Sequence, residues 1–488
     1  MTDRPPTPPS PPPNLVLVTA DQWRADCLGR FDGPHPVMTP HLDQLSYEGR
    51  TWTQCYADSP ICMPQRVSMM TGQAGYRTGQ TDHFLPDVRT PIDPRRSLPG
   101  RLAREAGYQT QAIGKMHFQP ARARMGFDHV VLHPDDYVNH LEGTEYAGMF
   151  RGHGLGGNEF YPACSPVPER LSHTRWMIDQ SIEFLRRRDP ESPFFLWLVL
   201  EAPHSPFDPP APYDKMYDRF DVPAPCMGGW ARETDALPAS LRERRLISKI
   251  DRTPAEVIDA FRRGYYGQCT HIDHQLGRLF GELRGQGVYD DTAVLFNSDH
   301  GELLGDHGLI FKSAFLRGSG DVPCIFKPPA TLADDRVGTT TDTPALTCDL
   351  VPTFLELAGL EPDDDQDGVS MLGDAADGPR TVFGEIGPSA MAFDGRHKLI
   401  HYGLDGARQL FDLANDPGEQ TNLAGETPRR EIETRLAEEL ADHLRRFERP
   451  MADGHGLATL PYTVPTEREL RATNQCAWRG PLRYGQGY

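Results

Sequence analysis

The sequence lacks the features of a membrane protein and of a disulfide-stabilised protein. Its longest apolar run, residues 194–200, is far shorter than the ~20 residues that a membrane-spanning helix needs. The nine cysteines are odd in number, scattered and without a Cys-x-x-Cys pair, so neither a disulfide framework nor a zinc knuckle is indicated. Free thiols and a start without an apolar leader favour a cytoplasmic protein that has no contact with a membrane.

Positive charge is also scarce. The 488 residues include 50 Lys and Arg against 69 Asp and Glu, which gives a formal net charge of −19. Proteins that bind nucleic acids present basic surfaces, so we expect no nucleic-acid partner. The acidic excess does not exclude a small anionic substrate, because one local basic pocket is enough to bind it.

Alternating strand and helix patterns predict an α/β protein. Apolar runs at 15–18, 194–200 and 293–296 have the length and composition of strands buried in a parallel sheet. The stretches 175–187 and 272–283 repeat apolar residues at helical spacing. We therefore expect a large mixed, mainly parallel sheet flanked by helices, with a smaller C-terminal α+β subdomain.

Composition divides the chain into four segments. Residues 1–13 are rich in proline and predict a disordered lead-in. Residues 14–377 hold the α/β domain, and residues 378–449 hold short strands and an amphipathic helix, the predicted subdomain. Residues 450–488 predict an extended tail, and its aromatic and arginine side chains suit an interface. These are Trp478, Arg479, Tyr484 and Tyr488.

Polar residues follow the predicted strands, at the edge where ligands bind in open α/β sheets. Asp21 and Gln22 come after the first strand, and Asp299 and His300 come after a later one. Carboxylate and amide oxygens suit a hard divalent cation such as Ca²⁺, Mg²⁺ or Mn²⁺, and an imidazole is less typical of Ca²⁺. Taken alone, the Asp21-Gln22 pair is also compatible with a helix cap.

The run Cys-Met-Pro-Gln-Arg at 62–66, followed by Thr-Gly at 71–72, is the most informative motif. Proline suits the first turn of a helix, so we expect Cys62 at a helix N-terminus, where the dipole favours an anion. Arg66, one turn further on, is expected to point back to residue 62. Free cysteines are more often small buried hydrophobes, but proline and arginine at this spacing favour a reactive site.

The chain resembles the type I sulfatases of the alkaline-phosphatase-like superfamily, in order from about residue 14 to about residue 423. Besides the motif at 62–72, the resemblance rests on Thr-Pro-His-Leu-Asp at 39–43, Gly-Lys-Met-His-Phe at 114–118, Ala-Pro-His-Ser-Pro at 202–206, Asn-Ser-Asp-His-Gly at 297–301 and Asn-Asp-Pro-Gly-Glu at 415–419. It implies the fold of that superfamily and a sulfuric ester hydrolase that uses one divalent cation. It also implies that a formylglycine-generating enzyme oxidises Cys62 to formylglycine, an aldehyde whose hydrate is the nucleophile.

The resemblance implies roles for individual residues. The metal ligands are expected to be Asp21, Gln22, Asp299, His300 and residue 62, with Ca²⁺ the expected ion and Mn²⁺ or Mg²⁺ the alternatives. The catalytic residues are expected to be Cys62, Arg66, Lys115, His117, His204 and Lys312. Of these, Lys115, His204 and Lys312 also bind the substrate, His117 accepts a proton from the intermediate, and His204 releases the alcohol. Asp299 or the metal activates the attacking hydroxyl.

Gln22 departs from the family, which commonly has a second aspartate at this position. Phosphonate monoester hydrolases and choline sulfatases resemble the chain in having Asp-Gln there, so a phosphonate monoester or phosphodiester hydrolase is the alternative function. The Lys115–His117 pair favours sulfate monoesters, and aryl, choline and carbohydrate sulfates all stay open as small-molecule substrates. A non-catalytic binder of sulfated ligands is a third function, but such a protein would have lost the cysteine or the metal ligands.

Two further expectations concern the tail and the other histidines. C-terminal extensions join protomers in choline sulfatases and phosphonate monoester hydrolases, so we expect a homodimer or a homotetramer. The alternative is a tail that wraps its own subunit. His307 is assigned to loop capping as readily as to the site, and His83, His271 and His274 receive no role.

Overall fold

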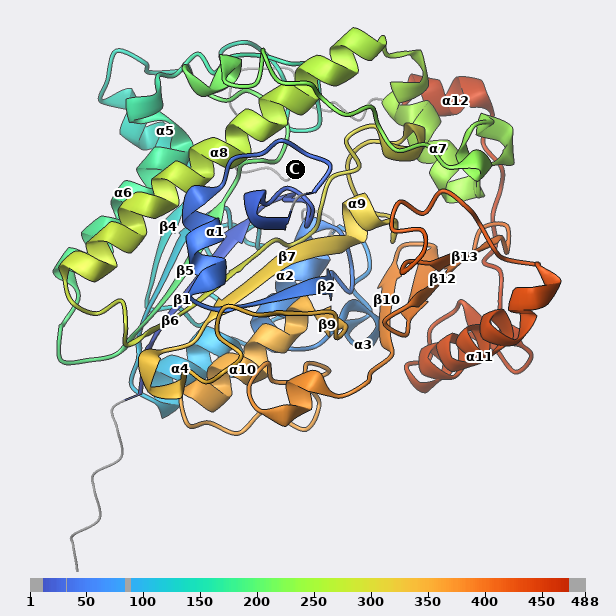
Figure 1. Cartoon of the computed structure of the whole chain (residues 1–488). Coiled ribbons are helices and arrows are strands. Elements are labelled where there is room, and N and C mark those ends of the chain that lie inside the picture. The colour runs from blue at the N-terminus through green and yellow to red at the C-terminus, as the bar shows by residue number, and fades with distance from the viewer. Residues whose placement is uncertain (1–11, 32, 84–88, 474–488) are drawn as a thin grey trace, which may run out of the picture.

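The computed structural model describes residues 12–31, 33–83 and 89–473. A nine-stranded sheet runs through the larger part of the chain, in the order β4-β3-β5-β1-β6-β7-β2-β8, with β9 also paired to β2 (Figure 1). Its strands are β1 (Asn14–Ala20), β2 (Arg50–Tyr56), β3 (Gln109–Gly114), β4 (His129–Leu132), β5 (Phe194–Leu200), β6 (Thr292–Asn297), β7 (Asp321–Lys327), β8 (Thr340–Thr341) and β9 (Ala345–Leu346).

The centre of this sheet is parallel. Strand β1 lies between β5 and β6 and is parallel to both, and β3 is parallel to β4 and β5. Only β7 runs antiparallel to its neighbours, β6 and β2. Every residue of β5 and β6 is buried, which explains why their sequences are continuous apolar runs. The predicted mixed, mainly parallel sheet is confirmed.

Helices cover both faces of the sheet (Figure 1). Side chains alternate along β1, so that Val16 and Val18 face one layer of helices and Leu15 and Leu17 face the other. The first layer contains α1 (Pro40–Tyr47), α6 (His173–Arg187) and α8 (Ala255–Gly285); the second contains α2 (Cys62–Thr71), α4 (Leu98–Glu105) and α10 (Leu350–Leu357). Other helices are α3 (Gly75–Thr78), α5 (Asp135–Glu142), α7 (Ala239–Ser248) and α9 (Arg317–Gly320).

Helix α8 extends much further than the sequence predicted. The apolar pattern indicated only residues 272–283, whereas the helix has 31 residues. Its earlier turns bury polar side chains, including Arg262 and Gln268, and these interrupt the apolar spacing. Within the described residues, no helix combines the length and apolar character needed to cross a membrane.

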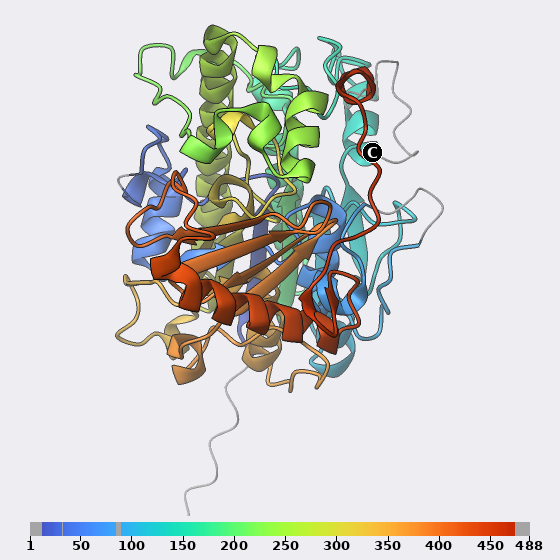
Figure 2. The ribbon, with the colours of Figure 1, turned by 90° about the vertical axis from the view of Figure 1, so that its right-hand side faces the viewer.

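A second, antiparallel sheet follows in the C-terminal part. Its order is β10 (Val382–Ile386), β11 (Ser389–Phe393), β12 (His397–Tyr402) and β13 (Arg408–Asp412). Helix α11 (Arg430–Arg446) lies across one face of this sheet (Figure 2) and buries Leu436, Leu440 and Leu444 against it. This arrangement confirms the predicted α+β character of the C-terminal part.

The tail predicted to be extended from residue 450 contains local structure. A short hairpin, β14 (Ala452–Asp453) and β15 (Gly456–Leu457), precedes helix α12 (Glu467–Ala472). Thr466 and Glu469 form a capping box at the start of α12. This sequence pattern indicates a helix N-terminus, and the prediction of an extended tail did not take it into account. The four predicted interface side chains at 478, 479, 484 and 488 and the lead-in up to residue 11 lie outside the described residues.

The antiparallel sheet holds the loop that precedes α2. The backbone N of Glu385 in β10 donates to the carbonyl of Asp58 at 2.9 Å, and Ser59 Oγ donates to the carbonyl of Glu385 at 2.8 Å. On the same side, Tyr56 and Ile61 share one apolar cluster with Phe393. The C-terminal part of the chain therefore positions the residues that lead into Cys62.

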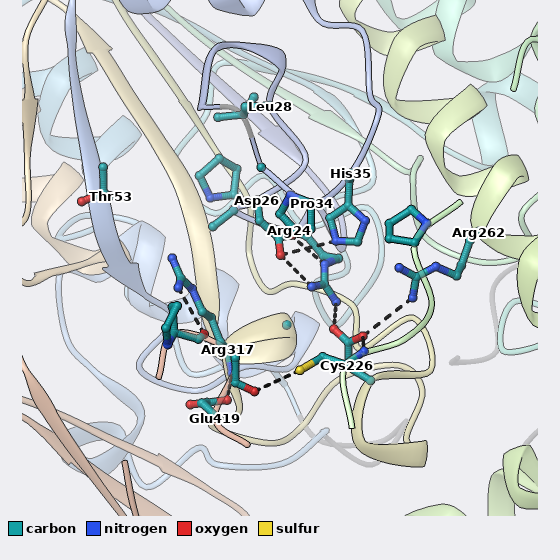
Figure 3. A pocket seen from close by; sticks show the side chains of 18 of the residues that line it. Arg24, Asp26, Leu28, Pro34, His35, Thr53, Cys226, Arg262, Arg317 and Glu419 are labelled. Carbon is teal, nitrogen blue, oxygen red and sulfur yellow. Dashed lines mark hydrogen bonds and ion pairs between the residues drawn. The ribbon is translucent and has the colours of Figure 1, made fainter. Parts of the chain in front are cut away.

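A cavity of about 620 Å³ lies between β2, β7 and the loop that follows β1 (Figure 3). Several of its charged side chains are paired: Arg24 contacts both Asp26 and Asp306 at 2.8 Å, and Glu419 Oε2 accepts from the backbone N of Arg317 at 2.7 Å. The residues that line this cavity include none of the predicted catalytic residues or metal ligands.

Candidate active site

The residues predicted from the motifs gather at the C-terminal edge of the parallel strands. Asp21 follows β1, Lys115 follows β3, His204 lies in the turn after β5, and Asp299 follows β6. Because β3, β5, β1 and β6 are adjacent and parallel, their C-terminal ends meet at one edge. The topology thus brings together side chains that are almost 300 positions apart in the sequence.

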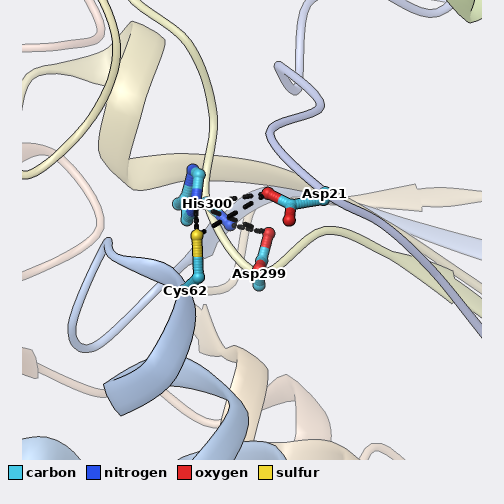
Figure 4. Close-up of side chains that lie close together, drawn as sticks. All are labelled: Asp21, Cys62, Asp299 and His300. Atoms are coloured by element: carbon cyan, nitrogen blue, oxygen red, sulfur yellow. Dashed lines mark hydrogen bonds and ion pairs between the residues drawn. The ribbon is translucent and has the colours of Figure 1, made fainter. Parts of the chain in front are cut away.

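Cys62 is the first residue of α2, and its thiol points into a cluster with Asp21, Asp299 and His300 (Figure 4). Cys62 Sγ lies 3.2 Å from His300 Nε2 and 3.9 Å from Asp21 Oδ1. The ligand atoms of the four residues all lie within 4.8 Å of one another.

The loop before Cys62 is fixed to its own helix. Ser59 N donates to Gln65 Oε1 at 2.9 Å, and Gln65 Nε2 donates to Asp58 Oδ1 at 2.8 Å. Ser68 Oγ and Gly75 N donate to the other oxygen of Asp58 at 2.8 and 2.9 Å. Asp58 and Gln65 are fully buried, so this network holds residue 62 in one position.

Arg66 is fully buried and binds the two carboxylates of the cluster. Its Nη2 donates to Asp21 Oδ2 and to Asp299 Oδ2, both at 2.8 Å, and its Nε donates to Asp299 Oδ2 at 3.0 Å. Burial alone would lower the pKa of Arg66, but Asp299 and Asp21 raise it instead. The sequence predicted contact with residue 62. In the described part of the chain its hydrogen bonds go to these carboxylates and to the carbonyl of Lys115, because buried carboxylates require a paired cation.

Lys115 and His117 lie on the same side of this cluster. Lys115 Nζ is 2.7 Å from Asp21 Oδ2. Burial would raise the pKa of Asp21, but Lys115, His204 and Arg66 together hold it well below its usual range. Burial and the charge of Lys115 keep the pKa of His117 well below its usual value, so its imidazole is neutral.

His204, Lys312 and Gln22 form a chain of polar contacts. His204 Nδ1 lies 2.8 Å from the carbonyl of Ser205. Because a carbonyl only accepts, Nδ1 carries the hydrogen, and His204 Nε2 accepts from Lys312 Nζ at 2.5 Å. Lys312 Nζ also donates to Gln22 Oε1 at 2.6 Å. The oxygen that the sequence predicted as a metal ligand is therefore engaged by a lysine, while Gln22 N donates to Asp299 Oδ1 at 3.2 Å.

Strained backbone surrounds these side chains. Gln22 (φ 73°), His117 (59°), Phe311 (68°) and Ser313 (66°), all at or next to these side chains, have positive φ angles in the left-handed region. Such conformations cost on the order of 1–3 kcal/mol each and persist where the surrounding structure enforces them. Phe311 and Ser313 flank Lys312, so part of this strain lies in the segment that positions its side chain.

The sequence missed two residues at this site. Glu302 is fully buried; it accepts from Gln22 Nε2 and from the backbone N of Phe311, the latter at 2.6 Å. Its position two residues after His300 was the available signal. His83 received no role, yet its ring lies beside His117 with centroids 5.6 Å apart. His307 Nδ1, by contrast, accepts from Gly228 N at 3.1 Å, a contact that favours the loop-capping alternative.

Comparison with known proteins agrees with this geometry. A family model described as Sulfatase matches residues 13–360. The arylsulfatase of Clostridium perfringens is 32% identical over 94% of this chain and 100% of that protein. The multifunctional alkaline phosphatase superfamily protein PehA of Trinickia caryophylli is 29% identical over 85% of this chain and 91% of that protein.

The fold is shared with solved structures. The phosphonate monoester hydrolase of Agrobacterium radiobacter superposes with a TM-score of 0.74 at 24% identity, covering 92% of this chain and 100% of that one. The likeness confirms the alkaline-phosphatase-like fold. The sequence matches confirm the family resemblance that the motifs predict and an enzyme of the sulfuric ester hydrolase class.

Proposed function

The chain belongs to the sulfatase family, and we propose that it hydrolyses sulfate monoesters with a formylglycine derived from Cys62 and one divalent cation. The observation that carries this proposal is the meeting of Cys62, Asp21, Asp299 and His300 within 4.8 Å at a buried strand edge. Arg66 on α2, together with Lys115 and Lys312 from other segments, brings positive charge to this cluster, as the binding of an anionic ester requires.

The donor set fits a hard divalent cation. Asp21 and Asp299 offer carboxylate oxygens, His300 offers Nε2, and all three side chains are fully buried. The oxygen majority favours Ca²⁺ or Mg²⁺, and the imidazole is compatible with Mn²⁺. When bound, the cation polarises the hydroxyl at residue 62 and the oxygens of the ester. Residue 62 and Gln22 are the other two predicted ligands, and the side-chain oxygen of Gln22 accepts a hydrogen bond from Lys312.

A hydrated aldehyde at residue 62 completes a two-step hydrolysis. One hydroxyl of the hydrate passes its proton to water and attacks sulfur. The bond between sulfur and the alcohol oxygen breaks, and the alcohol takes a proton from the His204–Lys312 pair. The second hydroxyl then gives its proton to His117, the aldehyde re-forms, and sulfate leaves as its bond to the formylglycine carbon breaks. Water adds to the aldehyde and restores the hydrate. A cysteine thiolate would instead form a stable sulfur-linked intermediate, so the oxidised residue suits the reaction better.

Asp299 was expected to act as the base for the attacking hydroxyl. Its Oδ1 accepts from the backbone N of Gln22 and of His300, and its Oδ2 accepts two hydrogen bonds from Arg66. These four hydrogen bonds fix the positions of both carboxylate oxygens. We therefore assign Asp299 to binding the cation and orienting Arg66.

We assign the protonation of the leaving alcohol to the His204–Lys312 pair. Lys312 Nζ carries the proton that it shares with His204 Nε2. His204→Ala and Lys312→Ala are each expected to lower kcat by about 10²–10⁴-fold for poor leaving groups and much less for good ones, since general acid catalysis has this magnitude. The measurement is kcat across a series of aryl sulfates whose phenols differ in pKa.

The double variant tests whether the pair acts as one unit. If His204 and Lys312 share one proton, removing both should cost little more than removing either one. Ser165→Ala is the control, because the backbone N of Ser165 donates to the carbonyl of Pro209 in the segment after His204, while its hydroxyl is not acidic at neutral pH. We expect this variant to keep the leaving-group dependence unchanged. A His204→Ala enzyme with the same dependence as the unmodified protein would contradict the assignment.

The transferred group is tested with two substrates that share one leaving group. We expect 4-nitrophenyl sulfate to be hydrolysed with a kcat/KM at least about tenfold above that of 4-nitrophenyl phenylphosphonate, a difference of about 1.4 kcal/mol in transition-state stabilisation. The shared phenol removes the leaving group as a variable, and one enzyme preparation fixes the content of the modified residue. A higher kcat/KM for the phosphonate would overturn the preference for sulfate.

A phosphonate monoester or phosphodiester hydrolase is the second candidate function. The observation that favours it is Gln22, because an amide replaces a carboxylate beside Lys312. Sulfate monoesters and phosphonate monoesters are both monoanions, so the net charge of the site fits either substrate. Absence of turnover with both ester classes, in protein that carries formylglycine, would instead favour a non-catalytic binder of sulfated ligands.

A further inference from the structure

A second cluster of metal-ligating side chains lies beside the candidate active site. His133 follows β4, Glu201 follows β5, and His173 is the first residue of α6. One ligand atom from each of the three lies within 4.8 Å of the others. The motifs that carry the proposed function include none of these residues.

The imidazole of His133 is buried without a hydrogen-bond partner. Its side chain has 0% exposure, and neither ring nitrogen has a hydrogen-bond partner in the part of the chain that the structure describes. Nδ1 of His173 is buried and lacks a partner in the same way. An unsatisfied buried polar group costs on the order of 1–3 kcal/mol, so native proteins rarely keep one unless something binds it.

Glu201 presents one oxygen to this imidazole. Arg151 Nη2 donates to Glu201 Oε1 at 2.8 Å, which leaves Oε2 on the side of His133, 3.5 Å from its Nε2. Arg151 orients this carboxylate, as outer-shell partners of metal ligands do.

We propose that His133, His173 and Glu201 bind a borderline divalent cation, with Zn²⁺ the expected one. Tetrahedral Zn²⁺ with bonds of about 2.0–2.1 Å holds neighbouring ligand atoms about 3.3 Å apart, close to the separation of His133 Nε2 and Glu201 Oε2. Two imidazoles and one carboxylate form a typical zinc ligand set. The rings of Tyr137 and Phe150 lie 5.5 and 5.4 Å from that of His133 and form an apolar wall around the cluster.

A comparable trio, Asp26, Cys27 and His35, lies beside the cavity of Figure 3, but both oxygens of its carboxylate are occupied. Arg24 donates to both oxygens of Asp26 at 2.8 Å, and His35 Nδ1 is 2.7 Å from the hydroxyl of Tyr266. A cation there would have to displace a bidentate guanidinium. The trio of His133, His173 and Glu201 keeps both its imidazoles and one carboxylate oxygen available.

A cation in this second cluster would hold two catalytic segments in place. His204 N donates to the carbonyl of Glu201 at 3.1 Å, and His133 N donates to the carbonyl of Gly114, next to Lys115, at 3.0 Å. Each of these backbone hydrogen bonds thus joins a proposed ligand to a segment that carries a residue of the proposed reaction. We assign the cluster a positioning role, outside the chemistry itself.

The test uses Co²⁺ as a spectroscopic probe on the full chain. Tetrahedral Co²⁺ bound by imidazoles absorbs strongly in the visible range, whereas Co²⁺ in an oxygen-rich site of higher coordination absorbs weakly. We expect one equivalent of Co²⁺ to give the strong bands in metal-free protein, and Zn²⁺ to abolish them by competition. Asp299→Asn, which disables the other site, should keep the bands, so the result is independent of the proposed function.

Variants locate the probe. His173→Ala and Glu201→Gln should remove the strong bands, while His140→Ala, an exposed histidine on the neighbouring helix α5, should keep them. His173 is only partly buried, so its replacement is the mildest, and circular dichroism verifies the fold of each variant. Strong bands that survive His173→Ala and Glu201→Gln in folded protein, or that never form in the unmodified chain, would overturn the proposal.

Discussion

Cys62→Ala is expected to lower kcat/KM for an aryl sulfate by about 10⁴-fold or more, because it removes the precursor of the covalent nucleophile. The thiol is 2% exposed and points at Asp21 and His300, so no neighbouring group of similar reach replaces it. The measurement is the initial rate with 4-nitrophenyl sulfate at saturating Ca²⁺.

The matched control for this variant is Cys164→Ala. Cys164 is an exposed free cysteine, remote in sequence from the motif, and its loss should leave kcat/KM unchanged. This control separates the role of residue 62 from a general effect of thiol removal. Retention of most of the activity by Cys62→Ala would refute the assignment of the nucleophile.

Asp299→Asn is expected to abolish high-affinity binding of the catalytic cation and to lower kcat/KM by about 10³-fold or more. The substitution keeps the shape of the side chain while removing one charge from the donor set. It also weakens the pairing of the buried Arg66, which bonds Asp299 through both Nε and Nη2. Breaking a buried ion pair typically costs about 3–5 kcal/mol, and the second partner, Asp21, should reduce this loss.

Two measurements separate these effects. Calorimetric titration with Ca²⁺ reports the binding site, and urea denaturation reports the free energy of unfolding. Asp291→Ala is the control, since this exposed carboxylate lies just before the same strand, β6, at the opposite edge of the sheet. Unchanged turnover of the unmodified protein after exhaustive chelation would eliminate the metal from the account.

The sequence predicted the strands of the site well because buried parallel strands are short and continuously apolar. That signal placed Asp21, His204 and Asp299 at strand ends. The right-handed βαβ rule limits the possible strand orders, but it does not by itself predict that β1 lies between β5 and β6. The position of Cys62 at the start of α2 was predicted from Pro64, and the αL cap at Gly72 (φ 73°) ends the helix.

Contacts between distant side chains could not be predicted. Arg66 was expected to point to residue 62. The fold also brings two buried carboxylates, Asp21 and Asp299, within 2.8 Å of its guanidinium, and these contacts could not be read from the sequence. Glu302 and the amide of Gln22 meet through a bond that spans 280 positions, and no local pattern encodes it. His133, His173 and Glu201 are likewise separated by long stretches of chain and match no metal-binding motif, so their clustering emerged only from the fold.

The identity of residue 62 is the central claim, and peptide mass spectrometry tests it most directly. Trypsin should release residues 51–66, which contain both Cys55 and Cys62, so fragmentation must locate the modified position. Preparations made with and without a formylglycine-generating enzyme should differ in formylglycine at 62, and their specific activity should rise in proportion to that content, through the origin. Full sulfate ester hydrolysis by protein that carries only cysteine at position 62 would contradict the account.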